Sequence, residues 1–169
     1  MLTKIKEYLS NLFKSTASVV VPTFKVKMME GCDDLFPIKA HEDDAGYDLK
    51  ANVPSDKNYI IKPGDLATIS LGFYCSLPKG YELQIRPRSG LTIKSRVTIA
   101  NTPGTVDCNY RGEVKAIVYN FGTEDFTITR GMRIAQGVVC KLPDVEILKV
   151  NELEESDRGE GGFGSTGTN

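Results

Sequence analysis

Apolar and polar residues alternate along most of the chain from Thr23 onward, which is the pattern of half-buried β-strands. Turn-forming Gly and Pro residues separate short runs that are rich in β-branched and aromatic side chains. These runs predict strands over Phe24–Met29, Tyr59–Ile61, Leu66–Ser76, Tyr81–Arg86, Val97–Ala100, Val114–Phe121, Phe126–Ile128, Arg133–Cys140 and Val145–Val150. Many short strands with hardly any helical periodicity predict an all-β fold, an antiparallel sandwich or barrel of the jelly-roll type.

Residues 1–22 follow a different pattern. Their apolar positions recur at helical spacing with lysines between them, and they are Leu2, Ile5, Leu9, Leu12 and Phe13. The pattern predicts a short amphipathic helix followed by a linker over residues 15–18. A helix of about three turns is marginal alone, so the segment packs on the body, binds a partner or frays. Glu7 and the lack of arginines weaken a transit-peptide interpretation, and the interrupted apolar positions do not fit a secretory signal.

The other end of the chain is acidic from Asn151 to Asp157 and then rich in glycine. Such a composition cannot form a core, so a flexible tail is expected. An Arg, a Phe and a Ser-Thr pair among the glycines are nevertheless more than a linker requires. We therefore divide the chain into an N-terminal extension (1–22), one β-barrel domain (23–150) and a C-terminal arm (151–169).

Composition narrows the class of protein. A length of 169 residues suits one domain. The 21 basic and 22 acidic residues leave a net charge of −1, so no overall electrostatic field attracts nucleic acid or an acidic membrane. No apolar run approaches the roughly 18 residues that span a bilayer, so a soluble protein is expected. The cysteines are widely spaced without a Cys-x-x-Cys pair, as in reduced cytosolic proteins, and they are Cys32, Cys75, Cys108 and Cys140.

His41 is the single histidine. A His-rich zinc site is therefore excluded, and so is a Ser-His or Cys-His nucleophile unless His41 itself serves. Cys108 lies beside Asp107, but nothing nearby in the sequence would activate a thiolate, so a passive side chain is favoured. Any catalysis is expected to use carboxylates.

The stretch Asn101–Gly112 packs turn formers, one carboxylate and one aromatic into a short span, and it is predicted to form the loop of a long hairpin. Its Pro-Gly dipeptide and Gly112 bend the backbone, so its amides are expected to lie outside any strand ladder. Asp107 could face a reacting centre, with Tyr110 closing one wall. An ordinary hairpin with a solvated Asp and a half-buried Tyr fits the same residues.

Three further segments offer polar groups. Arg86-Pro-Arg88-Ser89-Gly90 follows a predicted strand and could hold an anion, or could be a basic surface turn. Asp48 follows a glycine bend, where a turn cap is the alternative to a ligand. Arg133-Ile-Ala-Gln136 places a cation and an amide in an apolar strand, where a buried polar pair needs partners.

Together, five segments resemble the five motifs of the trimeric dUTPase family, in the same order and with similar spacing. They are Ala45-Gly-Tyr-Asp48-Leu, Pro87-Arg-Ser-Gly90-Leu, Asn101-x-Pro-Gly104-Thr-Val-Asp107-x-x-Tyr110-Arg-Gly112, Arg133-Ile-Ala-Gln136 and Arg158-Gly-x-Gly-Gly-Phe163-Gly-Ser-Thr166-Gly167. The resemblance covers residues 23–167. The chain departs from the family at Asn109, where a second Asp is common, at Gly137, where a bulky apolar residue is common, and in residues 1–22, which have no counterpart.

The resemblance implies a homotrimer of β jelly rolls with active sites at subunit boundaries, each completed by the tail of a neighbouring chain. The reaction would be hydrolysis of dUTP to dUMP and pyrophosphate, which limits uracil incorporation into DNA and supplies dUMP for dTMP synthesis. Asp107 would activate the water that attacks the α-phosphorus. Magnesium is expected on the triphosphate and water, with Asp48 at most an outer-shell contact.

The resemblance also assigns the substrate contacts. Asn101 and the backbone of Gly104, Thr105 and Val106 would pair with uracil, and Tyr110 would lie under the deoxyribose. The phosphate chain would be held by Arg88, Ser89, Gly90 and Gln136. The closing tail would contribute Arg158, Gly164, Ser165 and Thr166, with Phe163 stacked on the base.

Two alternatives remain. The related dCTP deaminases share the fold, but Asp107 and Phe163 argue against deamination, and release of pyrophosphate rather than ammonia would decide. A regulatory binding protein is the other, because viral and phage relatives can act as interaction partners and residues 1–22 could serve that role. The expected location is the cytoplasm, or the host cytoplasm for a viral or phage source.

Overall fold

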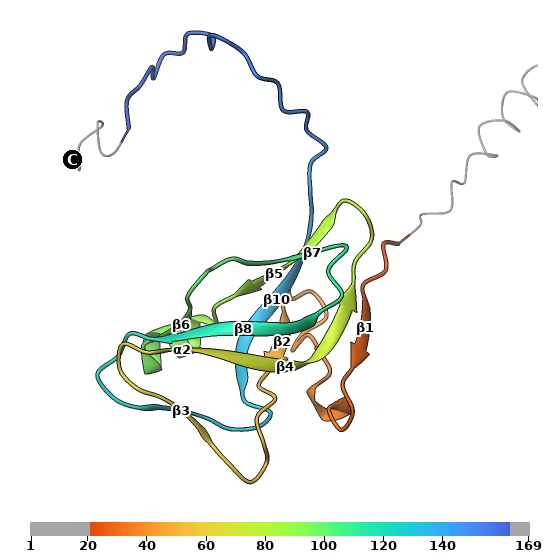
Figure 1. The fold of residues 1–169 in the computed structure, drawn as a ribbon, viewed down its shortest axis with the longest axis vertical. Helices are drawn as coiled ribbons and strands as arrows, with labels where there is room; N and C mark the ends of the chain where they lie inside the picture. Colours follow the sequence, from red (N-terminus) through yellow and green to blue (C-terminus); the bar gives the residue numbers. More distant parts are fainter. Residues whose placement is uncertain (1–20, 163–169) are drawn as a thin grey trace, which may run out of the picture.

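The computed structural model describes residues 21–162 (Figure 1). In chain order the elements are β1 (Lys25–Met28), the 3-10 turn η1 (Asp33–Leu35), β2 (Tyr47–Lys50), β3 (Tyr59–Ile61), β4 (Leu66–Ser76), β5 (Tyr81–Arg86), α2 (Ser89–Ser95), β6 (Val97–Ile99), β7 (Gly104–Asp107), β8 (Glu113–Asn120), β9 (Phe126–Ile128) and β10 (Arg133–Lys141). The helix predicted within residues 1–22 and the end of the tail from Phe163 lie outside the described residues, apart from 21 and 22.

The strands form one 4-stranded sheet in the order β1-β4-β8-β6, a second in the order β2-β10-β5-β7, and a 2-stranded sheet, β3-β9. Each of these strand pairs is antiparallel. The predicted all-β class is confirmed. Between residues 21 and 162 the strands form separate sheets and no closed barrel.

The core forms from the inward side chains of both 4-stranded sheets. Burial alternates along β8, where Val114, Ala116 and Val118 are buried between more exposed neighbours, as expected for strands with one face in the core. Leu83 and Ile85 of β5 belong to the same apolar cluster. The opposite face of β5, which carries Glu82, Gln84 and Arg86, is only partly covered.

The strand predicted over Val145–Val150 is wrong. From residue 142 to residue 162 the chain has no regular element, and Figure 1 shows it leaving the body beyond β10. Ile147 is 93% exposed and Val145 is 73% exposed. The apolar alternation is present there, but a strand needs a neighbouring strand, and none of the described strands lies beside residues 145–150.

Besides the 3-10 turn η1, two short strands and one α-helix were missed by the sequence analysis. Strand β2 follows a glycine bend that suggested a turn, and β7 falls inside the predicted hairpin loop. Helix α2 has seven residues and none is fully buried, although Leu91 packs against the core. It ends at Ser95 and is followed by Arg96, which adopts a left-handed conformation with φ 54°.

All four cysteines are free, with Cys32 and Cys75 buried and the other two half-buried. This agrees with the prediction that they form no disulfide framework. Within residues 21–162, none of the helices has the length and apolar character needed to cross a membrane.

Candidate active site

A cavity of about 240 Å³ lies beside strand β7, and we call it the β7 cavity. Its lining contains the site residues predicted in the Asn101–Gly112 stretch, which are Asn101, Gly104, Thr105, Val106, Asp107 and Tyr110. Residues that the sequence analysis did not assign complete the wall, and they are Thr68, Ile85, Glu113, Val114, Lys115 and Ile117. The structure therefore brings together the groups predicted to contact base, sugar and attacking water.

Strand β7 places the carboxylate of Asp107 outside the core. It pairs with β5, with Gly104 opposite Ile85 and Asp107 opposite Glu82. Burial alternates along β7, so Asp107 is exposed. The expectation that this backbone lies outside any ladder is therefore wrong, because β5 uses one edge of β7. Among residues 21–162 β7 is the last strand of its sheet, so no described strand pairs with its other edge.

The turn after β7 fixes Tyr110 against its own loop. The backbone N–H of Tyr110 donates to the carbonyl of Asp107 at 3.1 Å, and its hydroxyl donates to the carbonyl of Glu113 at 3.1 Å. Arg111 donates to the carbonyls of Cys108 and Tyr110, at 2.8 and 2.7 Å. Tyr110 is 45% exposed and forms part of the cavity wall.

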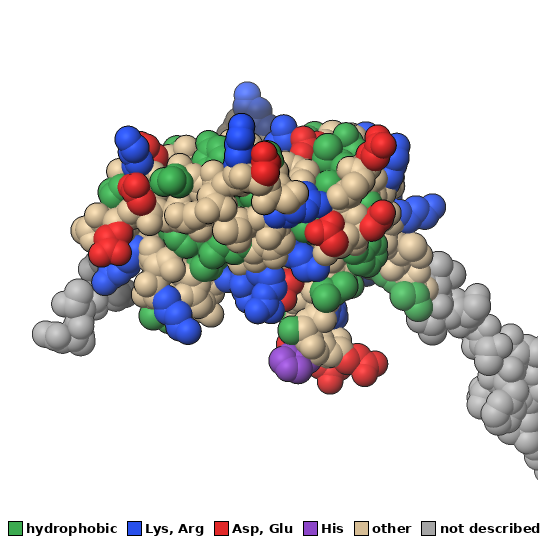
Figure 2. All heavy atoms as spheres, turned by 90° about the horizontal axis from the view of Figure 1, so that it is seen from below, with side chains coloured by type: hydrophobic (Ala, Val, Ile, Leu, Met, Phe, Trp, Pro, Cys, Tyr) green, Lys and Arg blue, Asp and Glu red, His purple; other side chains and the backbone are tan. Residues whose placement is uncertain are grey.

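A second cavity, of about 340 Å³, is strongly polar, and we call it the arginine cavity. It contains the predicted Asp48, Arg88, Ser89, Gly90 and Gln136, and also Arg133. Its rim is completed by Ala40, His41, Asp44, Ala45 and Gly46. Figure 2 shows the single histidine on a projecting loop beside acidic side chains.

Asp48 stands between two arginines in this cavity. Its Oδ1 lies 3.4 Å from Arg88 Nε, and its Oδ2 lies 3.0 Å from Arg133 Nη1. The side chain of Asp48 is only 14% exposed. Arg88 also donates to the backbone carbonyl of Arg133 at 2.9 Å. Arg133 is a site residue that the sequence analysis left unassigned, although it belongs to the same motif as Gln136.

Gln136 enters the cavity from β10, where it lies opposite Asp48 on one side and Arg86 on the other. Its amide donates to the carbonyl of Pro87 at 2.9 Å, so its orientation is fixed. The predicted need of Arg133 and Gln136 for polar partners is met.

Asp44 on the rim stays ionised readily. Its pKa is lowered mainly because the backbone N–H of His41 donates to its carboxylate at 2.9 Å, with smaller help from the His41 ring. Within residues 21–162 no three His, Cys, Asp or Glu side chains come together as a metal site.

The two cavities share no lining residue in the described part of the chain. Asp107 lies opposite Glu82, whereas Gln136 lies opposite Arg86. Asp107 and Gln136 are therefore separated by four residues along β5 and by two strand spacings across the sheet. These offsets place their Cα atoms about 16 Å apart. Figure 1 likewise shows α2, which begins next to Arg88, and β7 on different sides of the body.

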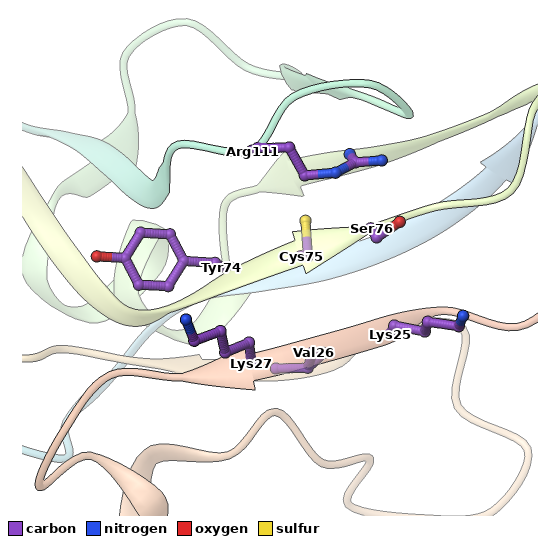
Figure 3. Close-up of a pocket in the computed structure, with 7 residues that line it drawn as sticks. All are labelled: Lys25, Val26, Lys27, Tyr74, Cys75, Ser76 and Arg111. Atoms are coloured by element: carbon purple, nitrogen blue, oxygen red, sulfur yellow. The ribbon is translucent and has the colours of Figure 1, made fainter.

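A larger cavity of about 400 Å³ lies against β1 and β4. Figure 3 shows Lys25 and Lys27 extending from β1, with Arg111 reaching over β4 from the loop that holds Tyr110. Cys75 points toward Arg111 in this view. The cavity contains none of the predicted site residues, so it is not part of the predicted site.

Arg158 is the one predicted tail residue that the structure describes. It is exposed, and its Nε donates to the carbonyl of Gly161 at 2.7 Å, so it contacts neither cavity. Phe163, Gly164, Ser165 and Thr166 lie outside the described residues.

Comparisons with known proteins agree with this architecture. The dUTPase family model matches residues 35–167. The deoxyuridine 5'-triphosphate nucleotidohydrolase of Caulobacter vibrioides is 49% identical over 144 residues, which is 85% of this chain and 93% of the relative. The protein of that name from Brucella melitensis is 44% identical over 155 residues, covering 91% and 99%. The solved dUTPase of Staphylococcus bacteriophage 80alpha with dUpNHpp has 27% identity and a TM-score of 0.75, covering 86% of this chain and 99% of that one.

Proposed function

This chain belongs to the dUTPase family, and we propose from that premise how its two cavities act on the nucleotide. The chain is a dUTP diphosphatase, which hydrolyses dUTP to dUMP and pyrophosphate. The reaction limits uracil incorporation into DNA and supplies dUMP for dTMP synthesis. Its chemistry is mostly positioning and electrostatic stabilisation of a highly charged phosphate chain.

Asp107 is the general base that activates the attacking water. The observation that carries this assignment is that Asp107 is exposed in the same cavity as Asn101 and Tyr110, so a carboxylate lies beside the groups suited to base and sugar. One carboxylate suffices, because water is the nucleophile and pyrophosphate the leaving group. Such a base typically contributes about 10²–10⁴-fold to the rate.

The free edge of β7 recognises the base. An edge strand presents amide and carbonyl groups in one plane, and uracil has a matching planar edge of donors and acceptors. Asn101 and the backbone of Gly104, Thr105 and Val106 make these contacts. Tyr110 lies against the deoxyribose and leaves no room for a 2′-hydroxyl group.

The arginine cavity holds the phosphate chain. Arg88 supplies a guanidinium that can bind phosphate oxygens, and Ser89, Gly90 and Gln136 supply hydroxyl, backbone and amide donors. Arg133 shares Asp48 with Arg88, so it adds positive charge and fixes the direction of Arg88.

Magnesium binds with the substrate rather than in a protein cage. Both oxygens of Asp48 face guanidinium groups, which leaves this carboxylate at most an outer-shell role through water. This fits Mg²⁺, which retains several waters and takes phosphate oxygens as ligands. When bound it neutralises charge that develops on the phosphate oxygens.

The active enzyme is a homotrimer in which each site is shared between chains. The separation of Asp107 from Gln136 within one chain supports shared sites. A general base must approach the water it activates to about 3 Å, so the Asp107 that acts on phosphates held by Gln136 has to come from another chain. The exposed apolar segment around Ile147 also calls for a neighbouring surface. Closed symmetry is the usual form of such assemblies.

In this assembly residues 23–150 form the domain, residues 151–169 form an arm, and residues 1–22 are an extension available to a regulatory partner. The arm closes on a neighbouring site, with Arg158, Gly164, Ser165 and Thr166 on the phosphates and Phe163 on the base. Support comes from Arg158, which is exposed and contacts only its own segment among the described residues. The four free cysteines suit the reducing cytoplasm, or the host cytoplasm of a virus or phage.

Pyrophosphate release measured in parallel with dUTP, dTTP, dCTP and UTP tests the function. We expect turnover of dUTP and very little with the other three. Ammonia release from dCTP would instead indicate a deaminase, and binding of nucleotide without turnover would indicate a regulatory protein.

A further inference from the structure

The position of Tyr110 depends on a residue that does not line the β7 cavity. Gly112 lies two residues along the chain, beneath the aromatic ring. A Cβ atom added at Gly112 would collide with the hydroxyl oxygen and Cζ of Tyr110 and would lie 2.9 Å from its Cε2. The ring therefore occupies the space that any side chain at position 112 would need.

The requirement for glycine at this position comes from space and not from backbone conformation. Gly112 is absent from the glycines with a positive φ, so its φ does not lie in the left-handed region that favours glycine over alanine. The three atoms nearest to a new Cβ all belong to the side chain of Tyr110.

The other contacts of Tyr110 leave the ring little choice of position. Its N–H is held by Asp107 and its hydroxyl by the carbonyl of Glu113, so both ends of the residue are fixed within one turn. With Gly112 below it, the ring can lie flat on the loop, and its exposed part forms the cavity wall. A methyl group at position 112 would lift the ring and break the bond to Glu113.

We infer that Gly112 is a specificity-determining positioning residue, which sets the depth at which Tyr110 meets the sugar. The inference rests on the proposed function, in which this ring excludes a 2′-hydroxyl group. A hydroxyl group is small, so the Tyr110 ring can distinguish dUTP from UTP only if its position is closely fixed. Glycine at 112 provides that placement before any nucleotide arrives.

The test compares kcat/KM for dUTP and for UTP in Gly112→Ala. A shift of the wall by about 1 Å should lower the dUTP/UTP ratio roughly 10- to 100-fold. Tyr110→Ala should lower the ratio to a similar level. In the double variant the alanine at 112 has no ring to displace, so the two effects should not add. An unchanged ratio in Gly112→Ala, or fully additive effects, would overturn the inference.

Two controls separate a positioning role from loss of structure. Gly64 adopts φ +80° in a turn and does not line the β7 cavity, so Gly64→Ala should also be destabilising while its dUTP/UTP ratio stays at the wild-type value. If Gly112→Ala lowers the melting midpoint, adding Tyr110→Ala should restore it, and no recovery would contradict the steric contact. Wild-type protein without turnover of dUTP would refute the proposed function itself. An active wild type together with an unchanged dUTP/UTP ratio in Gly112→Ala would refute only this inference.

Discussion

Arg133 Nη1 lies 3.0 Å from Asp48 Oδ2, and this ion pair joins a residue of β10 to one of β2 at the centre of the arginine cavity. The other oxygen of Asp48 faces Arg88. One carboxylate therefore orients two guanidinium groups that would otherwise repel each other.

Replacing Asp48 by Asn should release this arrangement, because an amide keeps one acceptor but loses the charge that holds both arginines. We expect kcat/KM for dUTP to fall at least about tenfold, because that is the size of effect expected when one charge-assisted contact is lost. Activity should be titrated with Mg²⁺ in parallel. The half-saturating Mg²⁺ concentration should stay the same, and a large increase would make Asp48 a metal ligand instead. Asp56→Asn, in an exposed turn, is the matched control.

Asp107→Asn keeps the shape of the side chain but removes its capacity to accept a proton. Turnover should fall at least ~10²-fold, while affinity for a non-hydrolysable dUTP analogue is largely retained. Steady-state kinetics and calorimetry measure the two quantities. Near-normal turnover would remove Asp107 from the mechanism.

Mixed assemblies test whether sites are shared. A chain carrying Asp107→Asn and a chain truncated after Asp157 are each expected to be inactive alone. When they assemble together, some sites combine an intact Asp107 with an intact arm, so part of the activity should return. Mass measurement under native conditions establishes that both chains are present in one trimer, and absence of rescue in such trimers would refute sharing.

Truncation after Asp157 on its own should slow turnover far more than it weakens nucleotide binding. The arm orders only when its contacts exceed the entropy that its glycines lose, and its closure excludes water from the reacting phosphate. Stacking of Phe163 on uracil should contribute about 1–3 kcal/mol. The melting midpoint should not change, since the core lies within β1 to β10. Full activity of the truncated chain would make the arm a simple terminus.

Cys75 should resist alkylation in the folded protein. Burial raises the pKa of its thiol, and the charge of Arg111 opposes this only in part. Because the thiolate is the reactive form, both the raised pKa and the 5% exposure slow the reaction. Iodoacetamide at pH 8 should modify Cys75 only after unfolding in urea, as read by peptide mass spectrometry. Rapid modification of the native protein would mean that β4 opens.

The sequence predicted the class of fold because alternation of apolar residues reports directly on sheets with one buried face. It predicted Asp107, Asn101 and Tyr110 as neighbours because they lie on one short stretch. It did not reveal β7, since four residues after a Pro-Gly turn carry too little pattern. Pairing of β7 with β5 is a property of tertiary structure.

The packing around Gly137 is likewise a property of tertiary structure that the sequence did not predict. A Cβ atom there would lie 3.1 Å from Leu83 Cδ1 and 3.3 Å from Leu49 Cδ1. These two leucines occupy the space that a side chain at position 137 would need. They lie far from Gly137 in the sequence, so no local pattern could indicate this packing.

The location of the two cavities at different places along β5 has a consequence for inheritance. If one site uses two chains, a polypeptide with a damaged Asp107 still lends a sound Arg88 to its neighbour, and the reverse holds as well. Two different loss-of-function alleles can then restore activity when expressed together, and a single such allele can depress the product of a healthy one. The dominance of a mutation would thus depend on which cavity it damages and on how chains mix during assembly.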